Sequence, residues 1–208
     1  MPPGSESGDA ENERRWQEGA AHWADTADAR FPAREAFWDL FTDTLADRFD
    51  QPIRIVELGS GPGFLAERIL NGVAVTAYTL VDISPAMHAL ARVRLAGASD
   101  KLSFVTANYG LPGWTERLGQ FDAVVSLQAI HEVRRKERVA PLYAALRAHL
   151  APGGLALICD RCLTPDHPGD EALHMTRAEH EQALARGGFT DIQLLAAVAD
   201  LAMFRATA

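Results

Sequence analysis

The chain has 208 residues, of which 48% are hydrophobic, and it carries a formal net charge of −8. This length fits one domain with a substantial core, or a domain with a short extension. The acidic balance disfavours nucleic acid as a partner, and no apolar run reaches the roughly 20 residues needed to span a bilayer. The first residues have the pattern of neither a signal peptide nor a transit sequence, so we expect a cytoplasmic protein.

The start of the chain changes character near position 12. Residues 1–11 are polar and acidic, and we expect them to form a disordered tail. Residues 12–50 are predicted to form a helical cap, in which Trp16 and Trp23 share one helical face and Pro32 separates two helices. Either the two helices only cover the sheet, or their aromatic residues contact a ligand.

The most informative stretch is E-L-G-S-G-P-G-F at residues 57–64, which follows the apolar run 53–56. Glycine takes positive φ and lets a bound molecule lie against the backbone, while free amides at the following helix start favour a negative group. The pattern predicts a strand, a tight turn that cradles a small molecule, and a helix. A dinucleotide-binding turn has the pattern G-x-G-x-x-G, but here the third glycine, Gly63, comes one residue early. This spacing weakens the interpretation as a nicotinamide-dinucleotide site.

A second strand is predicted over residues 73–81 and is followed by Asp82. A carboxylate at a strand tip can accept hydrogen bonds from both hydroxyls of a ribose, so we favour ribose binding over a plain surface position. Ser84 and the proline after it predict the start of a helix that runs to about residue 96. Ile83 and Met87 are either apolar contacts to an adenine ring or core residues.

The next two strands are predicted over residues 102–106 and 121–127. Asn108 can accept from an exocyclic amine and donate to a ring nitrogen, and Tyr109 can stack on a ring or cap a pocket. His131 follows the second of these strands, at the edge where open α/β sheets bind ligands. It could deprotonate an acceptor near neutral pH, orient that acceptor, or merely cap the next helix.

A helix over residues 135–150 and the turn A-P-G-G lead into a strand over residues 155–160. Asp160 and Arg161 end that strand and either contact the substrate or form a surface ion pair. The loop 163–173 is a second place to expect acceptor contacts.

The last third of the chain predicts a helix opened by the capping box 176–179, followed by two antiparallel strands over residues 189–195 and 201–206.

Cys159 and Cys162 form a C-x-x-C pair that closes a strand. Because a redox pair begins a helix and zinc needs further ligands, we favour two ordinary reduced thiols over a metal or redox site.

These motifs resemble the class I S-adenosylmethionine-dependent methyltransferases of the small-molecule type over residues 53–205. The acid followed by G-x-G-x-G, the F-D that begins the strand 121–127, the L-x-P-G-G turn and the late G-F pair carry the resemblance. It implies an α/β fold over residues 51–208 with a doubly wound, seven-stranded, mostly parallel sheet, a C-terminal antiparallel hairpin and preceding helices. Asn108 stands where this family often has an acid.

The implied cofactor is S-adenosyl-L-methionine, with S-adenosyl-L-homocysteine as product. The residues expected to bind it are Glu57, Gly59, Ser60, Gly61, Gly63, Asp82, Ile83, Met87, Asn108, Tyr109 and Ser126.

The implied reaction is methyl transfer to a small-molecule acceptor by direct in-line displacement. The donor is already activated, so the protein supplies alignment and excludes water, and a base is needed only for a protonated nucleophile. His131 is the catalytic candidate. Trp16, Trp23, Asp160 and Arg161 are candidates for substrate contacts, and we expect no metal site because Ser126 and Gln128 stand where a metal-assisted mechanism wants carboxylates.

Two alternatives stay open at this point. A non-catalytic cofactor-binding or regulatory protein would share every cofactor residue, and an NAD-dependent dehydrogenase would use Asp82 equally well. The expected partner is a small molecule, and a monomer or a homodimer fits the sequence.

Overall fold

The structure, a computed structural model, describes residues 5–208, apart from the side chains of residues 5–9 and 28. Its helices are α1 (Ser5–Arg30), α2 (Glu35–Arg48), α3 (Phe64–Gly72), α4 (Pro85–Arg94), α5 (Val139–Ala148) and α6 (Arg177–Arg186). Its strands are β1 (Ile53–Leu58), β2 (Val75–Asp82), β3 (Leu102–Thr106), β4 (Phe121–Leu127), β5 (Leu150–Arg161), β6 (Thr190–Val198) and β7 (Leu201–Thr207).

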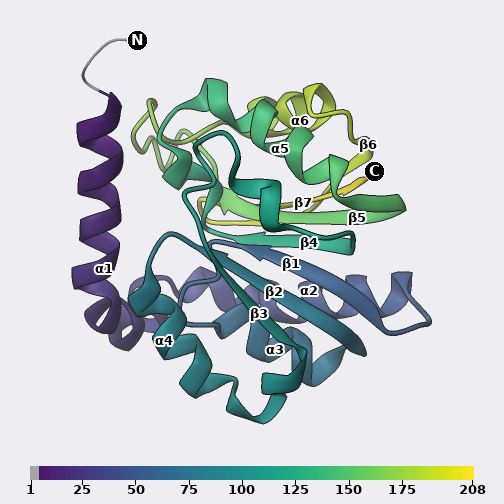
Figure 1. The fold of residues 1–208 in the computed structure, drawn as a ribbon. Helices are drawn as coiled ribbons and strands as arrows, with labels where there is room; N and C mark the ends of the chain where they lie inside the picture. Colours follow the sequence, from purple (N-terminus) through teal and green to yellow (C-terminus); the bar gives the residue numbers. More distant parts are fainter. Residues whose placement is uncertain (1–4) are drawn as a thin grey trace.

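The seven strands form one sheet in the order β3-β2-β1-β4-β5-β7-β6 (Figure 1). Neighbouring strands from β3 to β5 are parallel, and β7 is antiparallel to both β5 and β6. This arrangement confirms the predicted fold class. Because β1 pairs Leu58 with both Val81 of β2 and Ser126 of β4, the carboxyl ends of these strands meet at one edge of the sheet.

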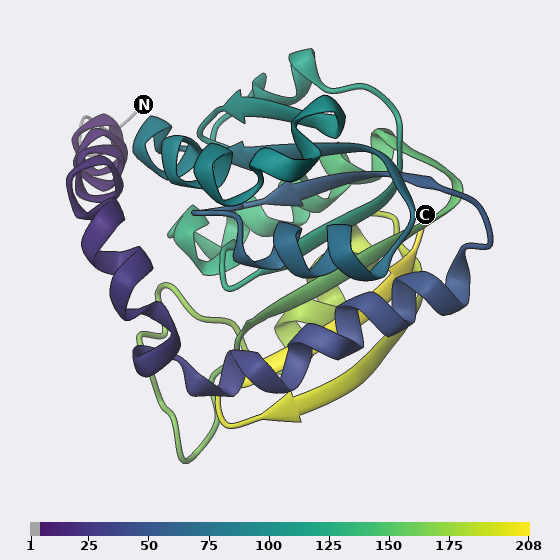
Figure 2. The same ribbon diagram turned by 90° about the horizontal axis from the view of Figure 1, so that it is seen from below.

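Helices cover both faces of the sheet, as buried apolar strands require. On one face, α5 and α6 pack through residues such as Tyr143 and Leu184. On the other face, α2, α3 and α4 pack through residues such as Phe41, Ile69 and Ala91. Figure 2 looks from below and shows α2 lying across its side of the molecule.

Helix α1 stands beside the sheet next to α4 (Figures 1 and 2). Two polar contacts fasten it to the start of α4: the Ser84 hydroxyl donates to the Trp16 carbonyl over 3.1 Å, and the Ala86 amide donates to Gln17 Oε1 over 3.1 Å. Ser84 also caps α4 as predicted, by accepting from the Met87 amide. The first helix is therefore attached to the element that follows the strand tip at Asp82.

Helix α1 begins at Ser5, so residues 5–11 are helical and not a disordered tail as predicted. Residues 1–4 of the predicted tail lie outside the described residues. The division into a cap and a methyltransferase domain stays a prediction.

Two other predicted boundaries are wrong for identifiable reasons. Helix α5 begins at Val139, since Pro141 has no N–H to donate and must lie in the first turn of a helix. Strand β5 already includes the A-P-G-G segment, because Leu150 pairs with Phe121 before a bulge restores pairing at Leu155. The capping box at Thr176 and Glu179 is present as predicted.

Within the described part of the chain, no helix is both long and apolar enough to cross a membrane.

Candidate cofactor and acceptor clefts

The glycine turn lies between the end of β1 and the start of α3. Gly59, Gly61 and Gly63 all have positive φ, at 61°, 51° and 83°. At Gly59 a Cβ atom would lie 2.2 Å from the Ala129 Cβ, so no larger residue fits there without movement of the backbone. The Ser60 amide donates to the Val81 carbonyl over 3.1 Å. The turn is thus held against the end of β2.

Asp82 links the turn to the helix behind it. Its Oδ2 accepts from the Gly61 amide over 2.8 Å, and its Oδ1 accepts from the Ser84 amide over 2.9 Å. Burial raises the pKa of Asp82 to about 6, although both amides oppose this shift by favouring the carboxylate. Each carboxylate oxygen keeps acceptor capacity for a further donor, such as a ribose hydroxyl.

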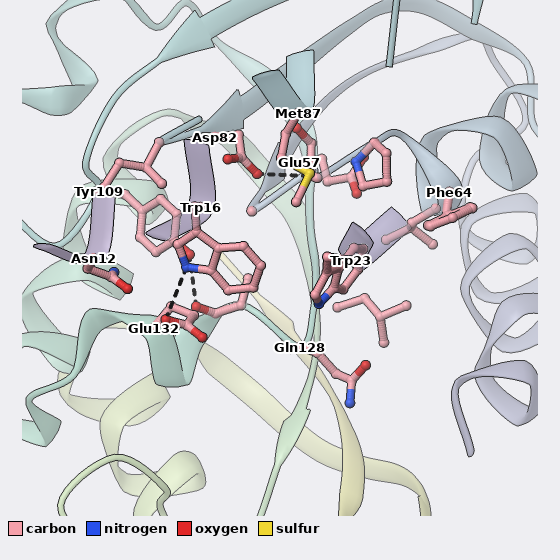
Figure 3. A pocket seen from close by; sticks show the side chains of 18 of the residues that line it. Asn12, Trp16, Trp23, Glu57, Phe64, Asp82, Met87, Tyr109, Gln128 and Glu132 are labelled. Atoms are coloured by element: carbon pink, nitrogen blue, oxygen red, sulfur yellow. Dashed lines mark hydrogen bonds between the residues drawn. The ribbon is translucent and has the colours of Figure 1, made fainter. Parts of the chain in front are cut away.

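A cleft opens over the turn and holds about 770 Å³ of space, its open mouth included (Figure 3). Most of the residues predicted to bind the cofactor line it. They are Glu57, Gly59, Ser60, Gly61, Asp82, Ile83, Met87, Asn108 and Tyr109. We call this space the cofactor cleft.

Two predicted cofactor residues do not line the cofactor cleft. The Ser126 side chain is fully buried, and its hydroxyl donates to the Leu58 carbonyl over 3.2 Å, so it joins β4 to β1. Gly63 is the N-cap of α3, and a Cβ there would meet Leu95 at 3.1 Å and Ala91 at 3.3 Å. Gly63 is therefore required for packing against the α4 segment rather than for ligand contact.

Glu57 lies inside the cleft wall with little exposure to solvent. The Tyr78 hydroxyl donates to its carboxyl group over 2.8 Å. Burial raises the pKa of Glu57 to about 8, although the Tyr78 hydrogen bond lowers it in part. A cationic ligand group in the cleft would favour the ionised form of this acid.

Asn108 and Tyr109 line the cofactor cleft from the segment after β3. Asn108 Oδ1 accepts from the Gly110 amide over 3.0 Å, which leaves its NH₂ group as the donor available to a ligand. The Tyr109 hydroxyl donates to the Ala129 carbonyl over 2.9 Å and so holds the ring at the wall of the cleft.

The sequence analysis missed several residues that line the cofactor cleft. Arg34 is buried, with its guanidinium 5.4 Å from the Trp23 ring and 5.5 Å from the Phe64 ring. Asn12 comes from α1, while Gln128 and Glu132 follow β4. No local pattern marks Asn12 and Arg34, because they reach the cleft only through the packing of α1 and the short helix Pro32–Arg34 against the sheet edge. Gln128 and Glu132 lie at that edge because they directly follow β4.

The cofactor cleft fits S-adenosylmethionine in its chemistry. Ser60 Oγ and Asn12 Oδ1 are buried and have no hydrogen-bond partner among the described residues. Both residues line the cleft, so these atoms can make polar contacts to a ligand. The acid Asp82 suits the ribose hydroxyls, and the acid Glu57 suits a cationic ligand group. The guanidinium of Arg34 suits the ligand's carboxylate.

A second cleft of about 990 Å³, its open mouth included, adjoins the first. The two share Trp16, Trp23, Gln128 and Glu132, whereas His131 and Arg161 line only the second. We call it the acceptor cleft. Its full lining is Arg15, Trp16, Gly19, His22, Trp23, Arg30, Phe31, Gln128, His131, Glu132 and Arg161.

The shared wall is built mainly from two indoles of α1. The Trp16 and Trp23 rings pack edge to face with centroids 6.1 Å apart (Figure 3). Trp16 Nε1 donates to Glu132 Oε2 over 3.4 Å, and Arg15 pairs with the same oxygen over 2.9 Å. Glu132 thus ties α1 to the segment after β4.

His131 is held by a buried carboxylate. Its Nδ1 lies 2.6 Å from Asp160 Oδ1, and its backbone amide donates to Asp160 Oδ2 over 2.9 Å. Burial lowers the pKa of His131, but Asp160 and then Glu132 more than offset this, so the pKa is raised overall. The other ring nitrogen, Nε2, lies 3.6 Å from Glu132 Oε1.

The structure corrects two expectations about substrate contacts. Asp160 has no exposed surface and lines neither cleft, because β5 points its side chain at His131. Residues 163–173 also line neither cleft. Trp16, Trp23 and Arg161 line the acceptor cleft, and Arg161 also forms an ion pair with Asp200 over 2.6 Å. Their contact with a substrate stays a prediction.

Cys159 and Cys162 are both free and buried. Burial raises the pKa of the Cys162 thiol to about 12 and that of Cys159 well above its usual value, so both groups are held as thiols.

Comparisons with known proteins identify the fold's relatives. Residues 55–154 match the family described as a methyltransferase domain. Together with the strand order, this match is that of the class I S-adenosylmethionine-dependent methyltransferase fold. Among solved structures, this chain superposes on the S-adenosylmethionine-bound amino pentose methyltransferase CalS10 of Micromonospora echinaspora with a TM-score of 0.66. The two sequences are 20% identical, and the superposition covers 87% of this chain and 95% of CalS10. The human N-acetylserotonin methyltransferase gives a TM-score of 0.61 at 19% identity over 88% and 58% of the two chains.

Two curated relatives show the range of this family. The malonyl-[acyl-carrier protein] O-methyltransferase of Geobacter sulfurreducens is 32% identical over 161 residues, which are 69% of this chain and 58% of that protein. The non-reducing polyketide synthase prhL of Penicillium brasilianum is 34% identical over 89 residues, or 40% of this chain and 4% of the synthase. The chain thus matches only part of each relative's length. The match to a methyltransferase domain argues against the dehydrogenase alternative.

Proposed function

We propose that this protein transfers a methyl group from S-adenosylmethionine to a small-molecule acceptor by direct in-line displacement. The observation that carries the proposal is the pair of adjoining clefts, of which one contains the glycine turn and Asp82 and the other contains His131. When bound, the cofactor supplies an electrophilic methyl group on a positively charged sulfur. The chain then has to align an acceptor with that methyl group and exclude water.

The cofactor cleft is proposed to hold the cofactor through three groups of contacts. Asp82 binds the ribose hydroxyls. Asn108, Ile83 and Met87 surround the adenine ring from the sheet edge. Arg34 binds the carboxylate of the amino-acid end, next to the glycine turn that gives this end a close approach to the backbone.

His131 is proposed to act as a general base on a protonated acceptor. With its Nδ1 held by Asp160, the neutral ring exposes the lone pair of Nε2. The pairing also stabilises the imidazolium that forms when Nε2 takes the proton. The side chain is only 15% exposed, so the proton moves within a nearly dry site.

The lining of the acceptor cleft supports a small-molecule acceptor, since ligand clefts are usually lined by apolar and aromatic side chains with a few polar groups among them. The relative from Geobacter is named for a malonyl group on an acyl-carrier protein, so acyl groups belong in a test panel with free metabolites. Our proposal further places the protein in the cytoplasm, as a monomer or homodimer that acts on neither nucleic acid nor membranes.

Calorimetry followed by turnover tests this proposal. We expect the full chain to bind S-adenosylmethionine and S-adenosylhomocysteine but not NAD, and to release S-adenosylhomocysteine with some member of a panel of small acceptors. Asp82→Asn should weaken cofactor binding. The control is Asp122→Asn, which should leave cofactor binding unchanged: Asp122 lies at the start of β4, and its carboxylate pairs with Arg54 of β1. Absence of cofactor binding would refute the proposal, and binding without any turnover would favour the non-catalytic alternative.

A further inference from the structure

Three arginines line the acceptor cleft of a chain whose net charge is −8. Arg15 comes from the interior of α1, Arg30 is the last residue of that helix, and Arg161 is the last residue of β5. The acidic residue in the same lining is Glu132. This wall is therefore cationic although the protein as a whole is acidic, and local charge of this kind selects ligands of the opposite sign.

The three cations differ in how far the protein already neutralises them. Arg15 forms its ion pair with Glu132 over 2.9 Å. Arg161 donates from Nε to Asp200 over 2.6 Å, and a guanidinium has further N–H donors at its two terminal nitrogens. Arg30 forms no ion pair within the described residues, and its guanidinium lies 5.4 Å from the Phe31 ring centre. Arg30 is thus the least neutralised of the three, and Arg161 keeps both terminal nitrogens as donors.

Arg161 has a defined position relative to the proposed base. The Asp160 carboxylate oxygen that faces His131 Nδ1 also accepts from the Arg161 backbone amide over 2.6 Å. One buried group therefore positions both the imidazole and the start of the arginine side chain. A ligand held by Arg161 would have a fixed offset from Nε2 of His131.

The remainder of the acceptor cleft is largely aromatic. Trp16 and Trp23 form the wall shared with the cofactor cleft, and Phe31 adds apolar surface next to Arg30. Such a surface suits a flat or apolar ligand body. The lining thus combines an apolar body site with oxyanion donors and a base.

We infer that the natural acceptor is an anionic small molecule, whose carboxylate or phosphate binds Arg30 and Arg161 while its apolar body packs on the indoles and its nucleophile faces His131. The planar guanidinium fork matches both oxyanions, which are thus one recognition chemistry. This inference rests on the proposed methyl transfer and adds the class of substrate to it.

Matched probe pairs test the inference on the full chain saturated with S-adenosylhomocysteine. Calorimetry measures the affinity of each probe. Aryl and acyl carboxylic acids are compared with the corresponding primary amides, and phosphate monoesters are compared with the free alcohols. We expect the anionic member of the best-binding pair to bind at least about ten-fold more tightly than its neutral partner. The two panels also show which oxyanion is preferred.

Substitutions then assign the effect to the two arginines. Arg30→Gln and Arg161→Gln should each weaken binding of that anion and raise its KM, with kcat little changed. Arg186→Gln, on an exposed face of α6 that lines neither cleft, is the matched control. Asp200→Asn, which removes the partner of Arg161 Nε, should leave anion affinity unchanged or raise it.

Each outcome decides the inference. The inference would be overturned if acids and amides bound equally, or if anion binding survived both arginine substitutions. It would also be overturned if no anion bound while S-adenosylhomocysteine did. Failure of S-adenosylhomocysteine itself to bind would instead count against the proposed function.

Discussion

The Asp160 carboxylate accepts from the His131 backbone amide at one oxygen and lies 2.6 Å from His131 Nδ1 at the other. A single buried acid therefore sets both the position of the backbone and the rotation of the ring. Replacing His131 by Asn should lower kcat by about 10²–10⁴ for an acceptor with a protonated nucleophile, because proton removal then has no base. Cofactor affinity should stay close to normal, since His131 does not line the cofactor cleft.

Asp160→Asn should move the pH dependence of kcat to lower pH. Burial lowers the pKa of His131, and Asp160 outweighs that effect and raises it. Activity needs the neutral ring, so it rises as pH passes the raised pKa; without the Asp160 charge this rise must occur at lower pH. A pH–kcat profile measures the change, with Asp122→Asn as the control. An unchanged profile would remove His131 as the base.

Glu132→Gln should loosen α1 and also shift the same pH profile to lower pH. Glu132 pairs with Arg15, accepts from Trp16 and helps to raise the pKa of His131. Loss of its charge weakens the attachment of the wall between the clefts, so KM should rise for both substrates. Glu137→Gln, in the nearby short helix Lys136–Arg138, is the matched control. Increased hydrogen exchange of α1 in the Glu132 variant would directly report the loosening.

Gly59→Ala should destabilise the fold and abolish cofactor binding. The added Cβ would lie 2.2 Å from the Ala129 Cβ, and alanine is strained at a φ of +61°. We expect the free energy of unfolding to fall by about 2–4 kcal/mol. Gly97→Ala, where an added Cβ meets nothing within 4 Å, is the control.

A second substitution separates the two effects at Gly59. Ala129→Gly removes the atom that the new methyl group would meet, so the double variant should be relieved of the clash but should retain the backbone strain. Denaturant unfolding measures all four proteins. Purely additive losses would show that the contact with Ala129 does not determine the requirement for glycine.

Glu57→Gln should make the protein without cofactor more stable at alkaline pH. The pKa of Glu57 is raised from 4.5 to about 8 in the folded protein, so the folded state favours the protonated acid. Stability from this group is complete below about pH 4.5 and is lost as pH rises through about 8. Glutamine stays neutral and removes this loss. Thermal unfolding from pH 5 to 9 tests the prediction, with the exposed Glu35→Gln as control.

Tyr78→Phe supplies the opposite change. The Tyr78 hydrogen bond lowers the pKa of Glu57, so its removal should raise that pKa further and deepen the alkaline loss of stability. A pH dependence identical in wild type, Glu57→Gln and Tyr78→Phe would contradict the assignment of the loss to Glu57.

The strand pattern and the cofactor side of the site could be predicted from local sequence. Apolar strands, the glycine turn at 59–63 and the acid at Asp82 act through spacing within a few residues, and parallel strands bring their carboxyl ends to one edge. On the acceptor side, the sequence offered candidates but could not separate the residues that line the cleft from those that do not. Asp160 and Arg161 are consecutive, yet one faces a buried histidine and the other faces the acceptor cleft.

The sequence alone determined the family, the order of the elements and most groups that face the cofactor, because these depend on short-range periodicity and on turns that only glycine can make. Tertiary structure decided the rest. Packing of α1 against α4 brings Trp16, Arg15 and Asn12 to the sheet edge, and burial pairs Asp160 with His131. Contacts between residues more than 100 positions apart, such as Arg15 with Glu132, leave no local pattern, since they arise only when the chain closes on itself.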